Sequence, residues 1–340
     1  MAVIRNTAAT FPVGPPFNTS PPYSGNFIPA VWSAKLNDKF YASTVFGEIS
    51  NSNWEGEVSG TGDKVFIQTA PTINVVDYVA GGAGLTYQVP APDVMELNID
   101  RAKAFAFQIN DVLEYQAKPN LLDMFTQDAG ETMKIAIDSN VLYNTVFQAA
   151  AANQGAGAGV RSGSFALGTA AAPLVINATQ GDVNNVLTKI LQMASALDEQ
   201  NVPESGRWLL MDPATRALLM NTNLAQAQFM GDSSSMVRNG KIGVIDRFTT
   251  YVTNQLPFAA ANATVWTAGA GNETSIAAVT NAARRRVIVA GHTSAITFAS
   301  QITKMETIRN PTDFGDYIRS LNVYGFRVVK PEALTVAVIA

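Results

Sequence analysis

Hydrophobic residues recur at steps of three, four or seven along residues 119–152. The stripe consists of Leu122, Phe125, Ala129, Met133, Ala136, Tyr143 and Phe147, with Asn140 as its polar interruption. This spacing predicts one long amphipathic helix, and Pro119 suits its first turn. At 1.5 Å per residue the helix would be about 50 Å long, so we expect a flat, elongated protein with strands laid along it. A coiled coil is disfavoured, because the e and g positions lack alternating charges.

Between residues 54 and 100 the hydrophobic period changes to two. The runs KVFIQTA (64–70) and VMELNID (94–100) both alternate. They predict the two arms of a long β-hairpin within residues 56–98, whose distal part is rich in glycine and proline. A third alternating run, AFAFQI (104–109), predicts a strand that leads into the long helix.

The first 42 residues divide into two patterns. Residues 1–27 hold five prolines among small polar residues and predict an extended arm, either disordered or laid on a neighbour. Residues 28–42 follow a helical period behind Pro29 and predict a short amphipathic helix, with Trp32 as its bulkiest anchor. We expect this helix to tie the arm to the body.

A glycine-rich stretch at 153–173 marks a lobe boundary and predicts a flexible connector. Beyond it, a helix is predicted from Asp182 as N-cap, and another after the Asp212-Pro213 cap signal. Strands are predicted at RWLLM, IGVID, TTYVT, RRVIVA and AITFA, which makes this lobe α+β. The tail at 321–340 predicts two strands, broken at Lys330-Pro331, that return to the long helix.

Composition narrows the functional classes. The net charge of -4 shows no strongly basic surface of the kind that nucleic-acid readers carry. Only 15% of the 340 residues are charged, so we infer that other chains cover much of the surface. The chain has no cysteine, which excludes disulfides, iron–sulfur clusters and thiol nucleophiles. No membrane span and no signal peptide is predicted.

Catalytic, cofactor and metal sites are not predicted. The chain lacks a Walker-type phosphate loop, and GAGAG at 155–159 follows a helix rather than a strand. His292, the single histidine, is interpreted as structural; the competing hypothesis is a hydrolase that uses His292 with Ser294 or Asp316. The pairs Glu55/Glu57 and Asp198/Glu199 are interpreted as solvated charge, and the arginines at 284–286 as solvated or paired with another subunit.

Several passages together resemble the major capsid proteins of tailed bacteriophages. In the second half these are LDEQNVPESGRWLLMDP (197–213), IGVIDRFTTYVTNQLP (242–257), VAGHTSAITFASQITKMETIR (289–309) and VYGFRVVKPEAL (323–334). Towards the front they are FIPAVWSAKLNDKFYASTVFGEISN (27–51), GDKVFIQTAP (62–71) and MKIAIDSNVL (133–142). The resemblance covers about residues 27–340, nearly the whole chain, and its specificity comes from the combination of passages.

The resemblance implies an α+β protein with the Hong Kong 97 type capsid fold. Its parts would be an N-terminal arm (1–27), an N-terminal helix leading into the peripheral domain (28–55), an extended loop (56–98), the peripheral domain (99–173) with its spine helix (119–152), an axial domain (174–300) and a return to the peripheral domain (301–340). A flat tile of this kind needs a long helix, an overlapping hairpin and low surface charge, all of which the patterns predict independently.

The resemblance also implies a function. The chain would be the non-catalytic major capsid protein of a tailed double-stranded DNA phage, forming hexamers and pentamers in an icosahedral shell assembled in the host cytoplasm. A portal, a separate scaffolding protein and non-specifically contacted DNA would be its partners, and a decoration protein is left open. The alternative within the fold is an encapsulin-type compartment around enzyme cargo. No basic residue lies between Lys64 and Arg101, so the lysine crosslink that some members form from the loop tip is not expected.

Intersubunit contact residues are predicted mainly in the extended loop. Its tip would lie on a neighbour and bury Tyr78, Leu85, Tyr87 and Val89, while Trp32 is a further candidate. The acidic residues Asp77, Asp93 and Glu96 call for basic partners on that neighbour, for which Arg309 and Arg319 are the candidates.

Overall fold

The computed structural model describes residues 44–54, 64–69, 71, 73–77, 87–111, 121–222, 243–258, 285–312 and 314–340. For residues 93, 121, 122 and 301–303 it describes the backbone alone. The predicted arm at 1–27, the predicted helix with Trp32, and the loop residues Tyr78 and Leu85 lie outside the described residues.

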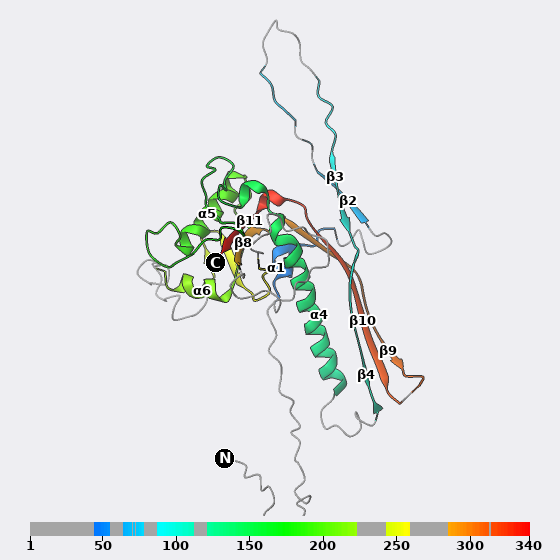
Figure 1. Ribbon diagram of the computed structural model, residues 1–340. Coiled ribbons are helices and arrows are strands. Elements are labelled where there is room, and N and C mark those ends of the chain that lie inside the picture. The colour runs from blue at the N-terminus through cyan, green and yellow to red at the C-terminus, as the bar shows by residue number, and fades with distance from the viewer. Residues whose placement is uncertain are drawn as a thin grey trace, which may run out of the picture.

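The described part is elongated and contains two main sheets (Figure 1). A four-stranded sheet has the order β1-β9-β10-β4, from strands Ser50–Asn51, Ile296–Arg309, Asp316–Val328 and Arg101–Ile109. A five-stranded sheet has the order β11-β8-β5-β7-β6, from Leu334–Ile339, Arg286–His292, Arg207–Met211, Phe248–Val252 and Val244–Ile245. The hairpin β2-β3 is formed by Lys64–Thr69 and Asp93–Asn98. The helices are α1 (Phe46–Ile49), α4 (Leu121–Thr145), α5 (Val186–Glu199) and α6 (Pro213–Met220).

Helix α4 runs along the four-stranded sheet, as expected from the sequence (Figure 1). Phe125 meets Phe107 of β4 edge to face, with ring centroids 6.1 Å apart. The predicted C-terminal end at residue 152 is wrong, because the helix ends at Thr145 and two 3₁₀ turns follow. Ala149 and Ala150 leave the helical conformation, with ψ angles of 148° and 146°, and the N–H of Ala150 donates to the carbonyl of Pro331 at 2.9 Å. The 25 described residues of α4 span about 37 Å.

The buried face of α4 also differs from the predicted stripe. The fully buried apolar positions are Val141 and Leu142, whereas Phe125 is 40% exposed and Met133 is half-buried. Val141 packs with Tyr324 of β10, while the adjacent Leu142 belongs to the core of the five-stranded sheet. The C-terminal half of α4 is therefore covered from two sides, so its buried face is wider than one stripe.

The predicted hairpin is present and its base is anchored. The inner face of β2 and β3, with Val65, Ile67 and Leu97 buried, packs against Ala299 of β9. The alternation predicted for these strands is confirmed, except that Thr69 is exposed. Gly325 of β10 lies directly against the carbonyl of Asn98, where a Cβ atom would overlap the backbone, so only glycine lets the chain cross here.

In the five-stranded sheet, every residue of β5 is buried, which confirms the strand predicted at RWLLM. The N-cap of α6 is Asp212, as predicted, and its Oδ1 accepts from the N–H of Thr215 at 3.1 Å. The predicted cap of α5 is wrong: Asn185, not Asp182, accepts from the N–H of Leu187 at 2.9 Å. Asp182 instead accepts from the Asn184 N–H within the preceding turn.

The glycine-rich stretch at 153–173 is an ordered loop, so the predicted flexible connector is wrong. Ala158 and Phe165 exchange backbone hydrogen bonds of 2.9 and 3.0 Å, and Ala158 and Leu167 are fully buried. Gly168 adopts a φ of +74° against the carbonyl of Val338, a conformation that favours glycine. The glycine at 168 lets two backbone segments pack closely and does not make the loop flexible.

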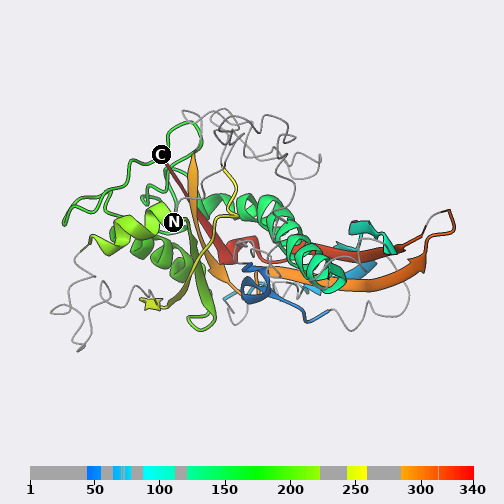
Figure 2. The ribbon, with the colours of Figure 1, turned by 90° about the horizontal axis from the view of Figure 1, so that it is seen from below.

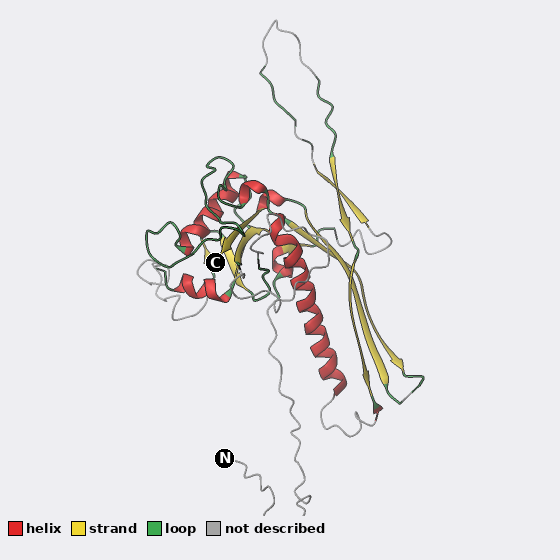
Figure 3. Cartoon of the chain, in the orientation of Figure 1, coloured by secondary structure: helices red, strands yellow, loops and turns green. Residues whose placement is uncertain are grey.

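The tail contains two strands broken at Lys330-Pro331, as predicted, but only β10 lies along α4. Strand β11 pairs with β8 in the other sheet and is flanked by α5, so the predicted return of both strands to the long helix is wrong. Strand β9 is longer than the predicted AITFA and runs through residue 300 without a break. Figure 3 shows that helices α5 and α6 lie beside the five-stranded sheet. Helix α4 lies beside the four-stranded sheet, which we call the long sheet.

Candidate assembly surfaces

The hairpin presents exposed apolar side chains beyond its paired stem, at residues 73–77 and 87–89, which we call the hairpin surface. The exposed fractions are 64% for Ile73, 96% for Val75, 61% for Val76, 89% for Tyr87 and 93% for Val89. Within the described part of the hairpin, its two limbs are joined by the side chain of Gln88, which donates to the carbonyl of Asn74 at 2.8 Å and accepts from its N–H at 3.0 Å. Several large exposed apolar side chains on a projecting element are typical of a protein–protein contact.

The acidic residues of the hairpin differ in their surroundings. The Glu96 carboxylate pairs with Lys64 across the stem at 3.2 Å. Asp77 is exposed on the hairpin surface, and the side chain of Asp93 lies outside the described residues. Glu96 is therefore already partly neutralised within its own chain.

Arg309 and Arg319 lie on the long sheet, at the end far from the hairpin (Figure 1). Arg309 pairs with Asp111, and with Asp316 at 3.2 Å, and these carboxylates raise the pKa of its guanidinium. Arg319 donates from Nε to Glu306 at 2.9 Å. Both arginines already have acidic partners, and a contact between them and the hairpin surface would have to join different subunits.

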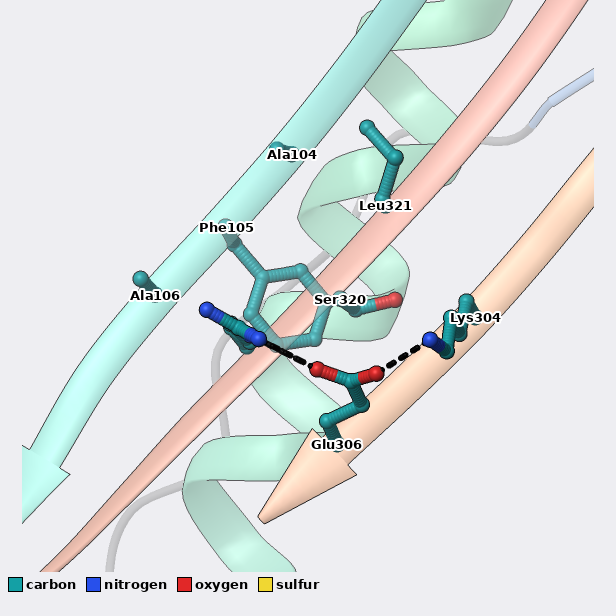
Figure 4. Close-up of a pocket in the computed structure, with 8 residues that line it drawn as sticks. Ala104, Phe105, Ala106, Lys304, Glu306, Ser320 and Leu321 are labelled. Carbon is teal, nitrogen blue, oxygen red and sulfur yellow. Dashed lines mark hydrogen bonds and ion pairs between the residues drawn. The ribbon is translucent and has the colours of Figure 1, made fainter. Parts of the chain in front are cut away.

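A hollow of about 520 Å³ lies on the sheet face opposite α4, as Figure 4 shows. Ala104 and Ala106 of β4 form part of its lining, and Glu306 bridges Arg319 and Lys304 across it. The hydrogen bond from Lys304, and then that from Arg319, holds the pKa of Glu306 below its usual value. Sequence reasoning missed this hollow, although alanines at every second position of β4 were an available signal.

His292 is the last residue of β8, and its side chain contacts a neighbouring loop. Its Nε2 lies 2.8 Å from the carbonyl of Ser205, and its Nδ1 accepts from the N–H of Ser294 at 3.1 Å. The Nδ1 atom also lies 2.8 Å from the hydroxyl of Ser294. Asp316, the other residue of the hydrolase hypothesis, pairs with Arg309. Both ring nitrogens of His292 therefore have structural partners, which agrees with the structural interpretation.

We predict that His292→Gln changes the free energy of unfolding by no more than about 1–2 kcal/mol, because glutamine can keep one of the hydrogen bonds. Burial lowers the pKa of His292 below 6.5. A lowered folded-state pKa contributes stability above pH 6.5 that is lost as the pH falls, and the variant should lose this acid dependence. Thermal melts at pH 5 and pH 7.5 check both points. Loss of a hydrolytic activity in the variant would instead support the enzyme hypothesis.

The acidic pair Asp198/Glu199 is not merely solvated, which corrects the sequence interpretation. Asp198 pairs with the buried Arg207 at 2.7 Å and with Arg247 at 3.1 Å. Glu199 accepts from the N–H of Arg161 at 2.8 Å, and this bond lowers the pKa of its carboxyl. These charges stabilise the loops around the five-stranded sheet. The pair Glu55/Glu57 lies outside the described residues.

The described part of the arginine cluster at 284–286 also makes contacts within its own chain. Arg286 pairs with Asp212 at 3.1 Å and donates to the carbonyl of Ala340 at 2.7 Å. Across the described residues, no group of histidine and acidic side chains could hold a metal ion, and no helix is long and apolar enough to span a membrane.

The matches to known proteins agree with this architecture. A sequence model of the family described as phage capsid protein matches residues 95–337, from β3 to β11. The chain belongs to the phage capsid protein family. The resemblance inferred from the sequence is therefore confirmed. No curated protein matches the chain.

Solved structures of phage capsids share the fold of this family member. A structure from Mycobacterium phage Che8 superimposes with a TM-score of 0.70 at 24% identity, covering 92% of this chain and 97% of that one. The capsid of cyanophage P-SCSP1u gives 0.67 at 16% identity, covering 92% and 93%. The mature capsid of bacteriophage PhiM1 gives 0.64 at 11% identity, covering 91% of each chain. The phage capsid chain described here thus has the Hong Kong 97 type fold predicted for it.

Proposed function

We propose that this protein is the major capsid protein of a tailed double-stranded DNA bacteriophage. It assembles as hexamers and pentamers into an icosahedral shell that encloses the genome. The observation that carries the proposal is the family match over residues 95–337, which spans α4 and both main sheets. The chain acts as a structural protein and not as an enzyme; the partners of His292 and Asp316 support this.

The hairpin surface is proposed as the main intersubunit contact. In the shell it lies on a neighbouring subunit and buries Tyr87 and Val89, which are 89% and 93% exposed in the single chain. Tyr78, Leu85 and Trp32 join this contact as further apolar anchors. Burying each of these large side chains contributes about 1.5–3 kcal/mol, and the contact repeats in every subunit.

The acidic residues of the hairpin are proposed to approach the basic end of a neighbour's long sheet. Asp77, Asp93 and Glu96 would then meet Arg309 and Arg319. Since exposed ion pairs contribute only about 0–1 kcal/mol, these arginines can exchange partners at little cost. The charges would affect the rate and salt dependence of assembly more than the stability of the shell.

Further partners follow from a shell that holds DNA. We propose a portal protein at one vertex, a separate scaffolding protein during assembly in the bacterial cytoplasm, and non-specific contact with the packaged DNA. A decoration protein is compatible with the exposed hollow on the long sheet. The net charge of -4 agrees with contacts to DNA that are few and independent of base sequence.

Sedimentation and negative-stain microscopy of the expressed protein test the proposal directly. A shell protein gives megadalton particles with icosahedral outlines, whereas a small soluble oligomer under all assembly conditions would count against it. Long double-stranded DNA inside particles purified from infected cells separates a phage capsid from an encapsulin-type compartment, which would hold enzyme cargo instead.

A further inference from the structure

The segment Val45–Asn51, which we call the junction segment, lies where the two sheets and α4 meet. Its last two residues form β1, which pairs in parallel with Ile296 and Thr297 of β9. Ile49 is fully buried in the core of the five-stranded sheet. Phe46 packs on the other side, with its ring centroid 4.9 Å from that of Phe298. Seven residues therefore contribute to both halves of the molecule, and Figure 2 shows α1 in blue between them.

Polar contacts extend the junction segment in the same two directions. Asn51 donates to the carbonyl of Thr293 at 3.1 Å, in the turn between β8 and β9. Glu48 lies 3.5 Å from the hydroxyl of Tyr251 on β7. The segment thus contacts a strand of the five-stranded sheet and a strand of the four-stranded sheet, next to the turn through which β8 runs into β9.

Helix α4 contributes one buried side chain to this segment. Asp138 is 0% exposed, and its Oδ1 accepts from the N–H of Phe46 at 2.9 Å and of Val45 at 3.2 Å. Helix α1 has no side-chain cap from its own N-cap position, so these orphan donors depend on α4. The second oxygen, Oδ2, is buried and has no hydrogen-bond partner among the described residues.

We propose that the junction segment is a latch that fixes the two sheets and α4 relative to one another, and that Asp138 is the positioning residue that holds it closed. A merely structural cap would be supplied more cheaply by a neutral serine or asparagine. An ionisable group in a dry junction makes closing of the latch depend on protons. The latch is also where residues 1–43 join the described body.

The direction of this proton dependence follows from burial. Burial raises the pKa of Asp138 from 3.8 to about 6, although its two backbone hydrogen bonds oppose the shift. A carboxyl whose pKa is raised in the closed state stabilises that state at low pH, and this stabilisation is lost as the pH rises through about 6. The closed latch is therefore weaker at pH 7 than at pH 5.

Other titratable groups lie on the elements packed around the latch. On the packed elements these are Glu48 of α1, Tyr251 of β7, Lys134 of α4, Arg101 of β4 and Tyr324 of β10. Glu48 pairs with Tyr251, Lys134 with Glu131 at 2.7 Å, and Arg101 donates to Asn140 at 2.8 Å. Burial and the two amides, not these groups, set the pKa of Asp138.

Hydrogen exchange of residues 45–51 in the unassembled full-length chain tests the latch. After correction for intrinsic exchange rates, the wild-type protection should rise about tenfold from pH 7 to pH 5. Asp138→Asn keeps an acceptor oxygen and should retain protection without the pH dependence. Asp138→Ala should lose protection at both pH values. Glu131→Gln, a more exposed acid on the same helix, is the matched control and should behave as wild type.

Two results would overturn the proposal: unchanged protection in Asp138→Ala, or the wild-type pH profile in Asp138→Asn. If the alanine variant does not fold, the comparison of wild type with Asp138→Asn still decides the question. The test does not depend on the proposed capsid function, since a chain that forms no particles can be measured in the same way.

Discussion

Val336→Asp is expected to leave no folded subunit. Val336 is 1% exposed in the middle of β11, and all six residues of that strand are buried. The strand pairs with β8 and packs against α5. A carboxylate at this position would therefore be shielded from water in an apolar environment. An unpaired buried carboxylate costs several kcal/mol, a large part of the 5–15 kcal/mol that typically stabilises a domain.

The soluble yield, circular dichroism and thermal melt of the variant measure this effect. Val183→Asp is the matched control, because Val183 is 70% exposed in the same half of the chain and should change the melting temperature little. A cooperative melt within a few degrees of wild type for Val336→Asp would show that β11 is not part of the core. The wild-type chain also cannot complete its five-stranded sheet until residue 339 has been synthesised, since β11 ends there.

The double variant Val75→Asp/Val89→Asp is expected to abolish particles while the subunit stays folded. These side chains are 96% and 93% exposed, so the single chain loses almost no packing when they change. In the proposed shell they are buried on a neighbour, where two carboxylates would replace about 1.5–3 kcal/mol of apolar burial each. Each subunit makes the same contact, so this loss of binding free energy is repeated at every hairpin contact of the shell.

Sedimentation measures particle formation, and a thermal melt of the subunit verifies its fold. The control is Val175→Asp/Val183→Asp, which makes the same chemical change at two exposed valines away from the hairpin. Limited proteolysis adds an independent measurement: cleavage within 77–93 should be fast in free subunits and slow in shells. Normal particles from the hairpin variant, or equal cleavage in both states, would contradict the proposed contact.

The family and the fold could be recognised from the sequence because many short passages point to one arrangement. Residue-level contacts could not. The charge of Arg309 and Arg319 predicts a contact with a neighbour's hairpin, but it does not predict their partners within the chain, which are Asp111 for Arg309 and Glu306 for Arg319. Such pairs join residues up to 198 positions apart, a separation over which no local pattern carries information.

Local chemistry in the sequence determined the elements with strong local signals. Alternation predicted β2, β3 and β4, the Asp212-Pro213 cap predicted the start of α6, and Lys330-Pro331 predicted the break between β10 and β11. Each depends on residues close in sequence, whose backbone preferences and hydrogen bonds act within a few positions. These features would be expected in any fold that the chain adopted.

Only the tertiary structure decided where these elements end and what they meet. Helix α4 ends at Thr145, and the chain that follows it is held by tertiary contacts such as the hydrogen bond from the N–H of Ala150 to the carbonyl of Pro331. The glycine-rich loop is ordered because it packs on the core, and β11 joins the five-stranded sheet because β8 offers it a free edge. Asp138 is buried and changes its proton affinity because two halves of the molecule close around it. Each outcome depends on contacts between distant parts of the chain, whose energies a local pattern does not contain.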